Sequence, residues 1–473
     1  MKKSRRVFLL VTVLALLFGC GTPAFALPEA GTPAMQGCLT LDAQVPIHSG
    51  EQIQETAEAV ILYELNSDTL VYSWNPDEPV DPSGMNKLMT ALLASELDQP
   101  EALVTVTREA LNSVAIGAVS AGLKSGEILT LEDLLFLMMV GSANDAAAVI
   151  AEFIGGSQAG FVELMNQRAA ELGCTNTKFQ NPHGLEHEDQ HTTARDLAKI
   201  TEAALENDLF LRLFSAVEHT VPATELSEER RVVTTNYLMS KETVRNQFDE
   251  RVTGGKTGAL STTNRSLIAT AESGECRYLS VVMSAKGAVT SNGLSVVKFG
   301  SFEETRALLD HGFSQYAIRQ VLHDGRTMEQ FSVNGGENDV VVRPAQTLVA
   351  ALPMELNPLD IRYRCTALEN LSAPIKTGQA VGTVEVWYQS ICVGQCDLVA
   401  MYGVAVPGTN SFLVQPTAQE ERAITLRSVL QIAGIVLLAL IVVAAVTVLI
   451  LRLVRAHRDK HLGAWVKPGR RGY

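Results

Sequence analysis

The chain has 473 residues, of which 47% are hydrophobic and 19% charged, and its net charge is −14. This length allows two or three domains with cores of their own, and the composition excludes a largely disordered protein. The two ends of the chain carry an excess of basic residues, although the net charge is negative. The body between them is therefore strongly acidic. An acidic body argues against nucleic acid as a partner.

Both ends carry membrane signals. Residues 1–26 combine basic residues, an apolar run and Ala24-Phe25-Ala26, the pattern of a cleaved signal peptide. An uncleaved anchor is the alternative, and Leu17-Phe18-Gly19-Cys20 also resembles a lipoprotein cleavage site. Residues 429–451 carry no charge, which predicts a transmembrane helix. The basic tail 452–473 is expected in the cytoplasm, which makes this a single-pass protein of the cell membrane with its body outside the cytoplasm.

Between these ends, the predicted elements form two regions. A linker over 27–50 leads to a β-hairpin with strands at 59–63 and 69–72. Helices are then expected from Lys87 onward, over 131–154, 161–172 and 193–205, followed by strands at 250–257, 266–271 and 278–284 and a helix at 303–316. This order predicts one α/β domain over 51–318, with a sheet flanked by helices.

The second region is shorter and β-prone. Short strands between 340 and 402 predict a small all-β domain over 319–412, which a linker over 413–428 joins to the transmembrane helix. The seven cysteines show no spacing typical of a disulfide framework. Cys392 and Cys396 are the closest pair, and they either bridge across a turn or remain buried thiols.

Three short motifs occur in order within the α/β region: Lys87 one turn inside an apolar helix, Ser142-Ala143-Asn144 within an apolar run, and Lys256-Thr257-Gly258 after two glycines. A desolvated lysine can act as the base for a serine one turn before it. Polar residues within so apolar a run favour a functional site, although Ser142 and Asn144 also suit a helix interruption or cap. Lys256 could be a solvated strand residue, but the two glycines before it allow the backbone to approach a ligand closely.

With LKSGEILTLEDLL at 123–135 and NPHGL at 181–185, these motifs resemble the serine-type D-alanyl-D-alanine carboxypeptidases, the low-molecular-weight penicillin-binding proteins. The resemblance implies a penicillin-binding/beta-lactamase-like fold of the α/β (α+β) class, with an antiparallel sheet. It implies peptidoglycan stem peptides ending in D-Ala-D-Ala as substrates, and β-lactams as ligands where a nucleophile functions. Neither a cofactor nor a metal is expected.

The resemblance also assigns roles to residues. Lys87 takes the proton of the nucleophile, and Ser142 relays protons toward the leaving amine. Lys256 and Thr257 bind the terminal carboxylate of the substrate, and the backbone N–H of Ala259 contributes to an oxyanion hole. The implied substrate-binding residues are Asn144, Lys256, Thr257, Gly258 and Ala259.

The nucleophile position itself is occupied by Gly84, which has no side chain to acylate. Ser83, one residue earlier, is a displaced nucleophile candidate, because residues 83 and 87 share a face if both are helical. One residue shifts a side chain by about 100° and about 1.5 Å along a helix, so alignment with the oxyanion donors requires a rewound first turn. Asn86 and Leu260 also depart from the family pattern.

Two functions therefore follow from the sequence: a carboxypeptidase that uses Ser83, or a catalytically inactive pseudoenzyme that binds stem peptides or cell-wall partners. Two further patterns are set aside. Lys376-Thr377-Gly378 repeats the third motif in the β domain, where we expect a surface turn. His183, His187 and His191 recur every fourth residue, but Pro182 and Gly184 argue against the continuous helix that a metal site of this spacing needs.

Overall fold

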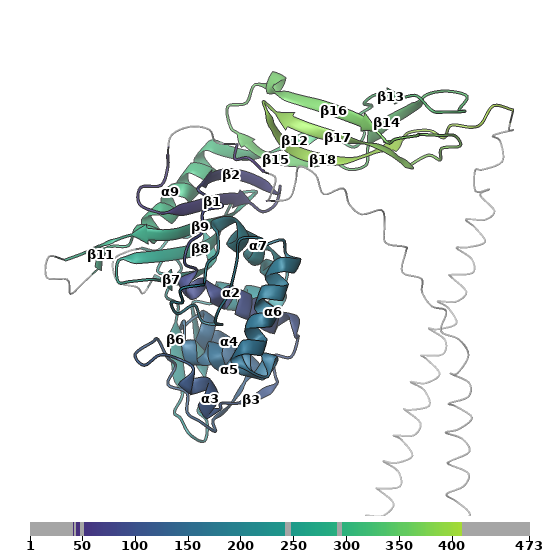
Figure 1. Ribbon diagram of the computed structural model, residues 1–473. Coiled ribbons are helices and arrows are strands. Elements are labelled where there is room, and N and C mark those ends of the chain that lie inside the picture. The colour runs from purple at the N-terminus through teal and green to yellow at the C-terminus, as the bar shows by residue number, and fades with distance from the viewer. Residues whose placement is uncertain (1–40, 42–43, 48–51, 242–246, 291–295, 409–473) are drawn as a thin grey trace, which may run out of the picture. The chain divides into compact units, whose positions relative to one another are not determined.

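The computed structural model describes residue 41 and the ranges 44–47, 52–241, 247–290 and 296–408 (Figure 1). The predicted signal peptide, transmembrane helix 429–451 and basic tail lie outside the described residues. Within the described ranges, no single helix is long and apolar enough to cross a membrane. One bent pair, α5 (Asn144–Gly155) and α6 (Gln158–Glu171), meets that criterion when the two helices are joined across an 83° bend.

A five-stranded antiparallel sheet lies at the centre of the first domain, in the order β2-β1-β9-β8-β7. Its strands are β1 (Ala59–Glu64), β2 (Thr69–Trp74), β7 (Val252–Ala259), β8 (Asn264–Ser273) and β9 (Cys276–Lys286). The prediction that the N-terminal hairpin shares a sheet with the three later strands is confirmed. Strand β7 carries Lys256 and is an edge strand, because β8 is the one strand paired with it among the described residues.

Strand β1 is apolar on both faces because each face of the sheet is covered. Ala59, Ile61 and Tyr63 belong to one apolar core with the helices between residues 86 and 215, whereas Val60 and Leu62 belong to a second core that includes residues of α9 (Gly300–Gln315). Successive strand residues point to opposite faces, so this alternation divides the domain into layers. Figure 1 shows α9 and the other helices on opposite sides of the sheet.

The helical layer consists of α2 (Asn86–Glu96), α3 (Arg108–Asn112), α4 (Leu131–Met139), α5, α6, α7 (Ala194–Leu205) and α8 (Asp208–Ser215). Among its described residues, the domain also contains three short strand pairs: β3 (Leu103–Thr105) with β4 (Ile128–Thr130), β5 (Glu218–Val221) with β6 (Arg230–Val233), and β10 (Ala288–Val289) with β11 (Val296–Lys298). These pairs and α3 are too short to show a hydrophobic period, and the sequence analysis missed them.

The prediction of one continuous helix over 131–154 is wrong. Helix α4 ends at Met139, and α5 begins at Asn144. Between them Ser142 has a φ of 59°, in the left-handed region, and Ala143 is extended. A right-handed helix cannot pass through a left-handed residue, so the second motif lies at a junction between two helices.

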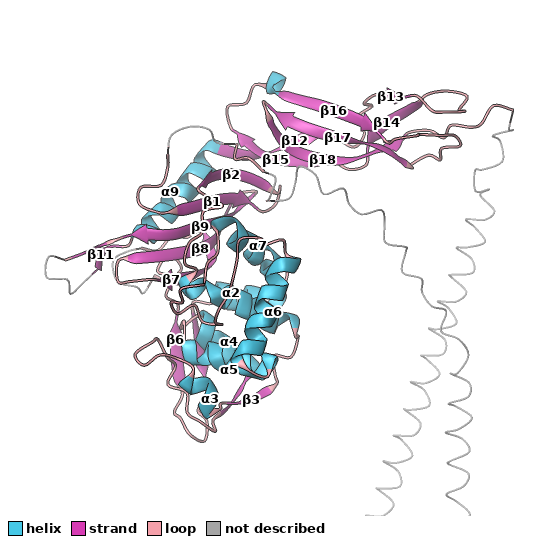
Figure 2. Cartoon of the chain, viewed as in Figure 1, coloured by secondary structure: helices cyan, strands magenta, loops and turns pink. Residues whose placement is uncertain are grey.

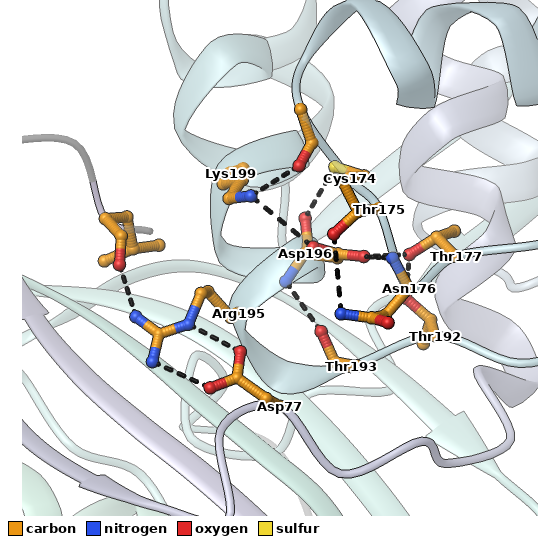
Figure 3. A network of polar contacts seen from close by, with 12 residues as sticks. Asp77, Cys174, Thr175, Asn176, Thr177, Thr192, Thr193, Arg195, Asp196 and Lys199 are labelled. Atoms are coloured by element: carbon orange, nitrogen blue, oxygen red, sulfur yellow. Dashed lines mark hydrogen bonds and ion pairs between the residues drawn. The ribbon is translucent and has the colours of Figure 1, made fainter. Parts of the chain in front are cut away.

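A polar network holds the start of α7 (Figure 3). The Thr193 hydroxyl caps the helix by accepting a hydrogen bond from Asp196 N at 3.1 Å. The buried carboxylate of Asp196 accepts hydrogen bonds from Asn176 N at 3.0 Å and from Thr177 Oγ1 at 2.7 Å. The helix start is thereby joined to the loop that follows α6.

The end of the predicted linker packs on the first hairpin instead of remaining apart from it. Gln44 Nε2 donates to Asp68 O at 2.7 Å, and Gln44 Oε1 accepts from Leu70 N at 2.7 Å. Ile47 N donates to Leu70 O at 3.1 Å. Backbone pairing of this kind depends on a partner strand, so it cannot be predicted from the composition of residues 44–47 alone.

The second domain is almost entirely β, as predicted (Figure 2). β12 (Tyr316–Leu322) pairs with β15 (Leu348–Pro353), and a five-stranded antiparallel sheet has the order β13-β14-β18-β17-β16. Its strands are β13 (Gln330–Phe331), β14 (Val340–Pro344), β16 (Ile361–Ala367), β17 (Ala380–Tyr388) and β18 (Ile391–Ala400), and a short 3-10 turn, η2 (Pro358–Asp360), precedes β16.

Two local predictions concern this domain. Cys392 and Cys396 both lie on β18, and both are thiols. Because a strand rises about 3.3 Å per residue, their Cα atoms are about 13 Å apart, so the bridge considered from the sequence is wrong.

Lys376-Thr377-Gly378 forms an exposed turn with Gly378 at a φ of 80°, as predicted.

Candidate active site

The first motif lies where a 3-10 turn, η1 (Ser83–Met85), leads into α2. Val80 pairs with Thr192 through backbone hydrogen bonds of 2.8 and 2.9 Å, which anchors the chain before the turn. Asp81 Oδ1 then accepts a hydrogen bond from Ser83 N at 2.6 Å, and Ser83 has a φ of 46°. The left-handed region costs a non-glycine residue about 1–2 kcal/mol. Ser83 therefore lies outside the helical screw of α2.

Two glycines enclose Ser83 and Gly84. A Cβ on Gly258 of β7 would collide with Ser83 Oγ, and a Cβ on Gly184, whose φ is 80°, would collide with the carbonyl oxygen of Ser83. A Cβ on Gly84 would lie 3.3 Å from both Gly258 Cα and Thr257 O. The edge strand and the loop after α6 therefore pack directly on the position where the family has its nucleophile.

Lys87 is buried and engaged. Its Nζ donates to Asn144 Oδ1 at 2.8 Å and to His183 O at 2.5 Å, and the side chain is 2% exposed. Burial, and secondarily the charge of Lys256, lower the pKa of Lys87 well below its ordinary value. Burial, and secondarily Lys87, lower the pKa of His183 to about 3, so this imidazole is neutral. The lysine thus has the electrostatic character of a general base.

The Ser83 hydroxyl does not join this cluster. Ser83 is 1% exposed, and its Oγ has no hydrogen-bond partner among the described residues, Lys87 included. The prediction that Ser83 and Lys87 share a helix face is wrong, because the left-handed φ at Ser83 breaks the screw before α2 begins. A hydroxyl that is not bonded to the base is not activated by it in this conformation.

The second and third motifs meet at Lys256. Its Nζ donates to Ser142 Oγ at 3.0 Å and to Thr257 O at 2.9 Å, and the side chain is 1% exposed. Burial lowers the pKa of Lys256 to about 7. The interpretation of Lys256 as a solvated strand residue is therefore wrong, and the left-handed turn at Ser142 is what directs its hydroxyl toward β7.

Asn144 and its neighbour hold the loop before β4. Asn144 Nδ2 donates to Val119 O at 3.0 Å, while its Oδ1 accepts from Lys87. The carboxylate of Asp145 accepts from Ser120 Oγ at 2.6 Å and from Ala121 N at 2.9 Å. Asp145 was missed from the sequence, where its only signal is adjacency to the second motif.

Two further contacts were also missed. Thr235 Oγ1 lies 2.5 Å from Thr257 Oγ1, so a loop residue with no motif of its own orients the hydroxyl of the third motif. Asn86, one of the departures from the family pattern, donates through Nδ2 to Asn181 O and to Gln190 Oε1, both at 2.7 Å. This departure ties α2 to the loop that also supplies the carbonyl group bonded to Lys87.

The remaining predicted residues lie at the rim. Ala259 ends β7 and is exposed, and Leu260 is 39% exposed beside it. His183, His187 and His191 lie in a loop and not on one helix. Across the described ranges, no group of three or more His, Cys, Asp or Glu side chains is placed to hold a metal ion.

Two family profiles match the chain. That of D-alanyl-D-alanine carboxypeptidase covers residues 46–287, and that of the penicillin-binding protein 5 C-terminal domain covers residues 316–405. The carboxypeptidase DacF of Bacillus subtilis is 27% identical over 365 residues, which are 76% of this chain and 89% of that protein. The carboxypeptidase DacD of Salmonella typhimurium is 29% identical over 368 residues, or 76% and 88% of the two chains.

Solved structures agree with these matches. Penicillin-binding protein 5 of Haemophilus influenzae superposes with a TM-score of 0.60 at 26% identity, over 76% of this chain and 99% of that one. Penicillin-binding protein 6B of Escherichia coli superposes with a TM-score of 0.57 at 26% identity, again over 76% and 99%. Both domains of the described structure therefore have counterparts in proteins of known structure.

Proposed function

The chain belongs to the D-alanyl-D-alanine carboxypeptidase family, and from this premise we propose that it binds peptidoglycan stem peptides ending in D-Ala-D-Ala without cleaving them. Its first domain has the beta-lactamase/transpeptidase-like fold, and a β-rich C-terminal domain follows. One observation carries the proposal: position 84 has no side chain, and the nearby hydroxyl of Ser83 has no hydrogen-bond partner in the described structure.

Serine-type cleavage needs three parts in contact: a hydroxyl, a base that takes its proton, and N–H donors for the developing oxyanion. This chain retains the base, since Lys87 is buried and its pKa is lowered. It lacks the hydroxyl at the required place, and the amine of Lys87 is bonded instead to Asn144 and to the carbonyl group of His183. We therefore expect no acyl intermediate.

The groups that would hold a peptide are retained. Lys256 and Thr257 are consecutive residues of β7, and they carry the ammonium group and the hydroxyl that would bind a terminal carboxylate. Because β7 is an edge strand, its outer backbone groups are available to pair with an extended peptide. Asn144 joins the same cluster of side chains through its hydrogen bond from Lys87 Nζ. Binding without turnover uses all of these groups and does not require a side chain at Gly84.

The proposal includes an exported body on a membrane anchor. The support is in the sequence: the signal-peptide pattern of residues 1–26 and the uncharged stretch 429–451 before a basic tail. A tether of this kind would hold the peptide-binding domain beside its polymeric ligand.

Labelling with a fluorescent penicillin, followed by intact-mass measurement and peptide mapping, tests the absence of turnover. We expect no covalent adduct on the full-length chain and no release of D-alanine from a stem-peptide substrate. An adduct mapped to Ser83 would overturn the proposal and establish a carboxypeptidase with a displaced nucleophile.

A Gly84→Ser variant tests whether the rest of the site is intact. Its hydroxyl would stand at the family's nucleophile position beside Lys87, so we expect it to become labelled by penicillin. Gly84→Ala is the matched control, because both variants add a Cβ at 3.3 Å from Gly258 Cα and differ only in the hydroxyl. A folded Gly84→Ser chain that stays unlabelled would show that the pocket has diverged beyond its nucleophile.

A further inference from the structure

The loop of residues 181–185 is bonded to α2 through three consecutive carbonyl groups. The three bonds run from Asn86 Nδ2 to Asn181 O at 2.7 Å, from Thr90 Oγ1 to Pro182 O at 2.7 Å, and from Lys87 Nζ to His183 O at 2.5 Å. All three side chains of α2 are at most 2% exposed. The carbonyl group that Lys87 contacts is therefore one of a row, and its place depends on the bonds beside it.

Asn86 also holds the far end of this loop, through Gln190. Its Nδ2 donates a second hydrogen to Gln190 Oε1 at 2.7 Å, and Gln190 Nε2 donates to Leu185 O at 3.4 Å. Asn86 is 0% exposed and Gln190 5%. An amide has two N–H donors, whereas a hydroxyl has one, so a serine or threonine at position 86 could not bond both Asn181 O and Gln190 Oε1. We call Asn86 and Gln190 the clasp, because they bond the first and the last residue of the loop.

The position of the loop determines what surrounds the amine of Lys87. That amine is buried and donates to His183 O and to Asn144 Oδ1, which lies 2.8 Å away. Because Lys87 bonds the oxygen of the Asn144 amide, the NH2 group of that amide faces Val119 O, to which it donates at 3.0 Å. A shift of the His183 carbonyl group would leave a buried amine short of an acceptor, which is unfavourable unless the lysine moves as well. A movement of Lys87 would in turn release Asn144.

We propose that Asn86 and Gln190 are positioning residues of the peptide site: they hold the 181–185 loop so that His183 O and Asn144 Oδ1 share the amine of Lys87. This rests on the proposed function and assigns a role in peptide binding to two residues outside the predicted set of site residues. Loss of the clasp is expected to free the amine of Lys87 and to leave Asn144 without a fixed orientation, which weakens peptide binding.

Alanine variants of the full-length chain separate this role from a purely structural one. Asn86→Ala and Gln190→Ala each remove one half of the clasp. Asn166→Ala is the matched control, because Asn166 Nδ2 also donates to two carbonyl groups, Val162 O at 2.9 Å and Phe179 O at 3.0 Å, and so holds the chain just before the loop. Calorimetry would measure the affinity for an N-acylated tripeptide ending in D-Ala-D-Ala, and urea unfolding would measure stability.

The amine of Lys87 can be followed directly by brief acetylation with acetic anhydride and peptide mapping. Lys199 is the internal reference, because it is 8% exposed and its Nζ donates to Gly173 O at 2.7 Å. A role in positioning changes the acetylation rate of Lys87 alone, whereas general loosening of the domain changes the rates of both lysines.

We expect Asn86→Ala and Gln190→Ala each to be acetylated at Lys87 about tenfold faster and to bind the tripeptide about tenfold more weakly, with Lys199 unchanged. The double variant should be no more affected than the weaker-binding single variant, because two residues that act as one unit are not additive. Asn166→Ala should match the parent chain in both measurements, whatever stability it loses.

Unchanged acetylation of Lys87, or an equal rise at Lys87 and Lys199, would overturn the clasp while leaving the proposed function standing. The same effects in Asn166→Ala, or an unchanged affinity for the tripeptide in the two clasp variants, would also overturn it. A parent chain that does not bind the tripeptide would overturn the proposed function itself.

Discussion

At the scale of single residues, two buried lysines determine what the site can bind. Lys87 is turned inward, toward Asn144 and the carbonyl group of His183, and its lowered pKa favours the neutral amine. Lys256 has a pKa of about 7, so near neutral pH it is divided between an ammonium group and an amine. The charge available to a peptide carboxylate therefore depends on pH.

Peptide affinity should fall as the pH rises through 7. Below the pKa of about 7 Lys256 is protonated and attracts the carboxylate, and above that pKa it becomes neutral and the attraction is lost. We expect the affinity to decline by up to about tenfold per pH unit above neutrality, as measured by calorimetry. The same peptide with an amidated C-terminus is the control and should show little of this slope. Identical pH profiles for the two peptides would contradict the role of Lys256.

At the scale of elements, the departures from prediction lie where the backbone turns left-handed. Hydrophobic periodicity indicated a helix from Lys87 onward and another over 131–154, but it carries no information on the φ values of Ser83 and Ser142. The left-handed backbone at Ser83 keeps its hydroxyl away from Lys87. The left-handed backbone at Ser142 directs its hydroxyl to Lys256. Ser83 packs against Gly258 of β7 and Gly184 of the 181–185 loop, and Ser142 is bonded to Lys256 of β7. Such tertiary contacts cannot be predicted from local sequence.

The network at the start of α7 should contribute measurably to stability. Asp196→Asn keeps the side-chain size but replaces an acceptor that serves Asn176 N and Thr177 Oγ1. We expect the free energy of unfolding to fall by about 1–3 kcal/mol, because a buried polar group loses a partner. Asp208→Asn, an exposed first-turn acid on α8, is the control and should cost less than about 1 kcal/mol. Equal losses in urea unfolding would contradict the role of the network.

At the scale of the whole molecule, composition and motif order predicted more of the architecture than the hydrophobic periodicity of single segments did. The two-region body, the single sheet built from the hairpin and three later strands, and the all-β second domain were all anticipated. The family resemblance placed Ser142 and Lys256 in one site with separate roles, but their direct hydrogen bond was not predicted, since nothing in either segment specifies the other. The short strand pairs, Thr235 and Asp145 could not be predicted, because their partners are distant in sequence and they form no motif.

The sequence also predicts how the chain is arranged across the membrane. If residues 429–451 cross the membrane once, alkaline extraction should leave the protein in the membrane fraction. Protease added outside the cell membrane should digest the body and leave the tail 452–473 protected, as detected by a C-terminal epitope tag. Release of the intact chain by alkali, or digestion of the tail together with the body, would contradict the single-pass arrangement.

The central claim is that this carboxypeptidase-family site binds its peptide without cleaving it. The most direct measurement is a calorimetric titration of the full-length chain with a tripeptide ending in D-Ala-D-Ala, with D-alanine quantified in the same cell afterwards. We predict saturable binding at a pH below 7 and no D-alanine above the blank. Release of D-alanine that disappears in a Ser83→Ala variant would contradict the account and make Ser83 the nucleophile.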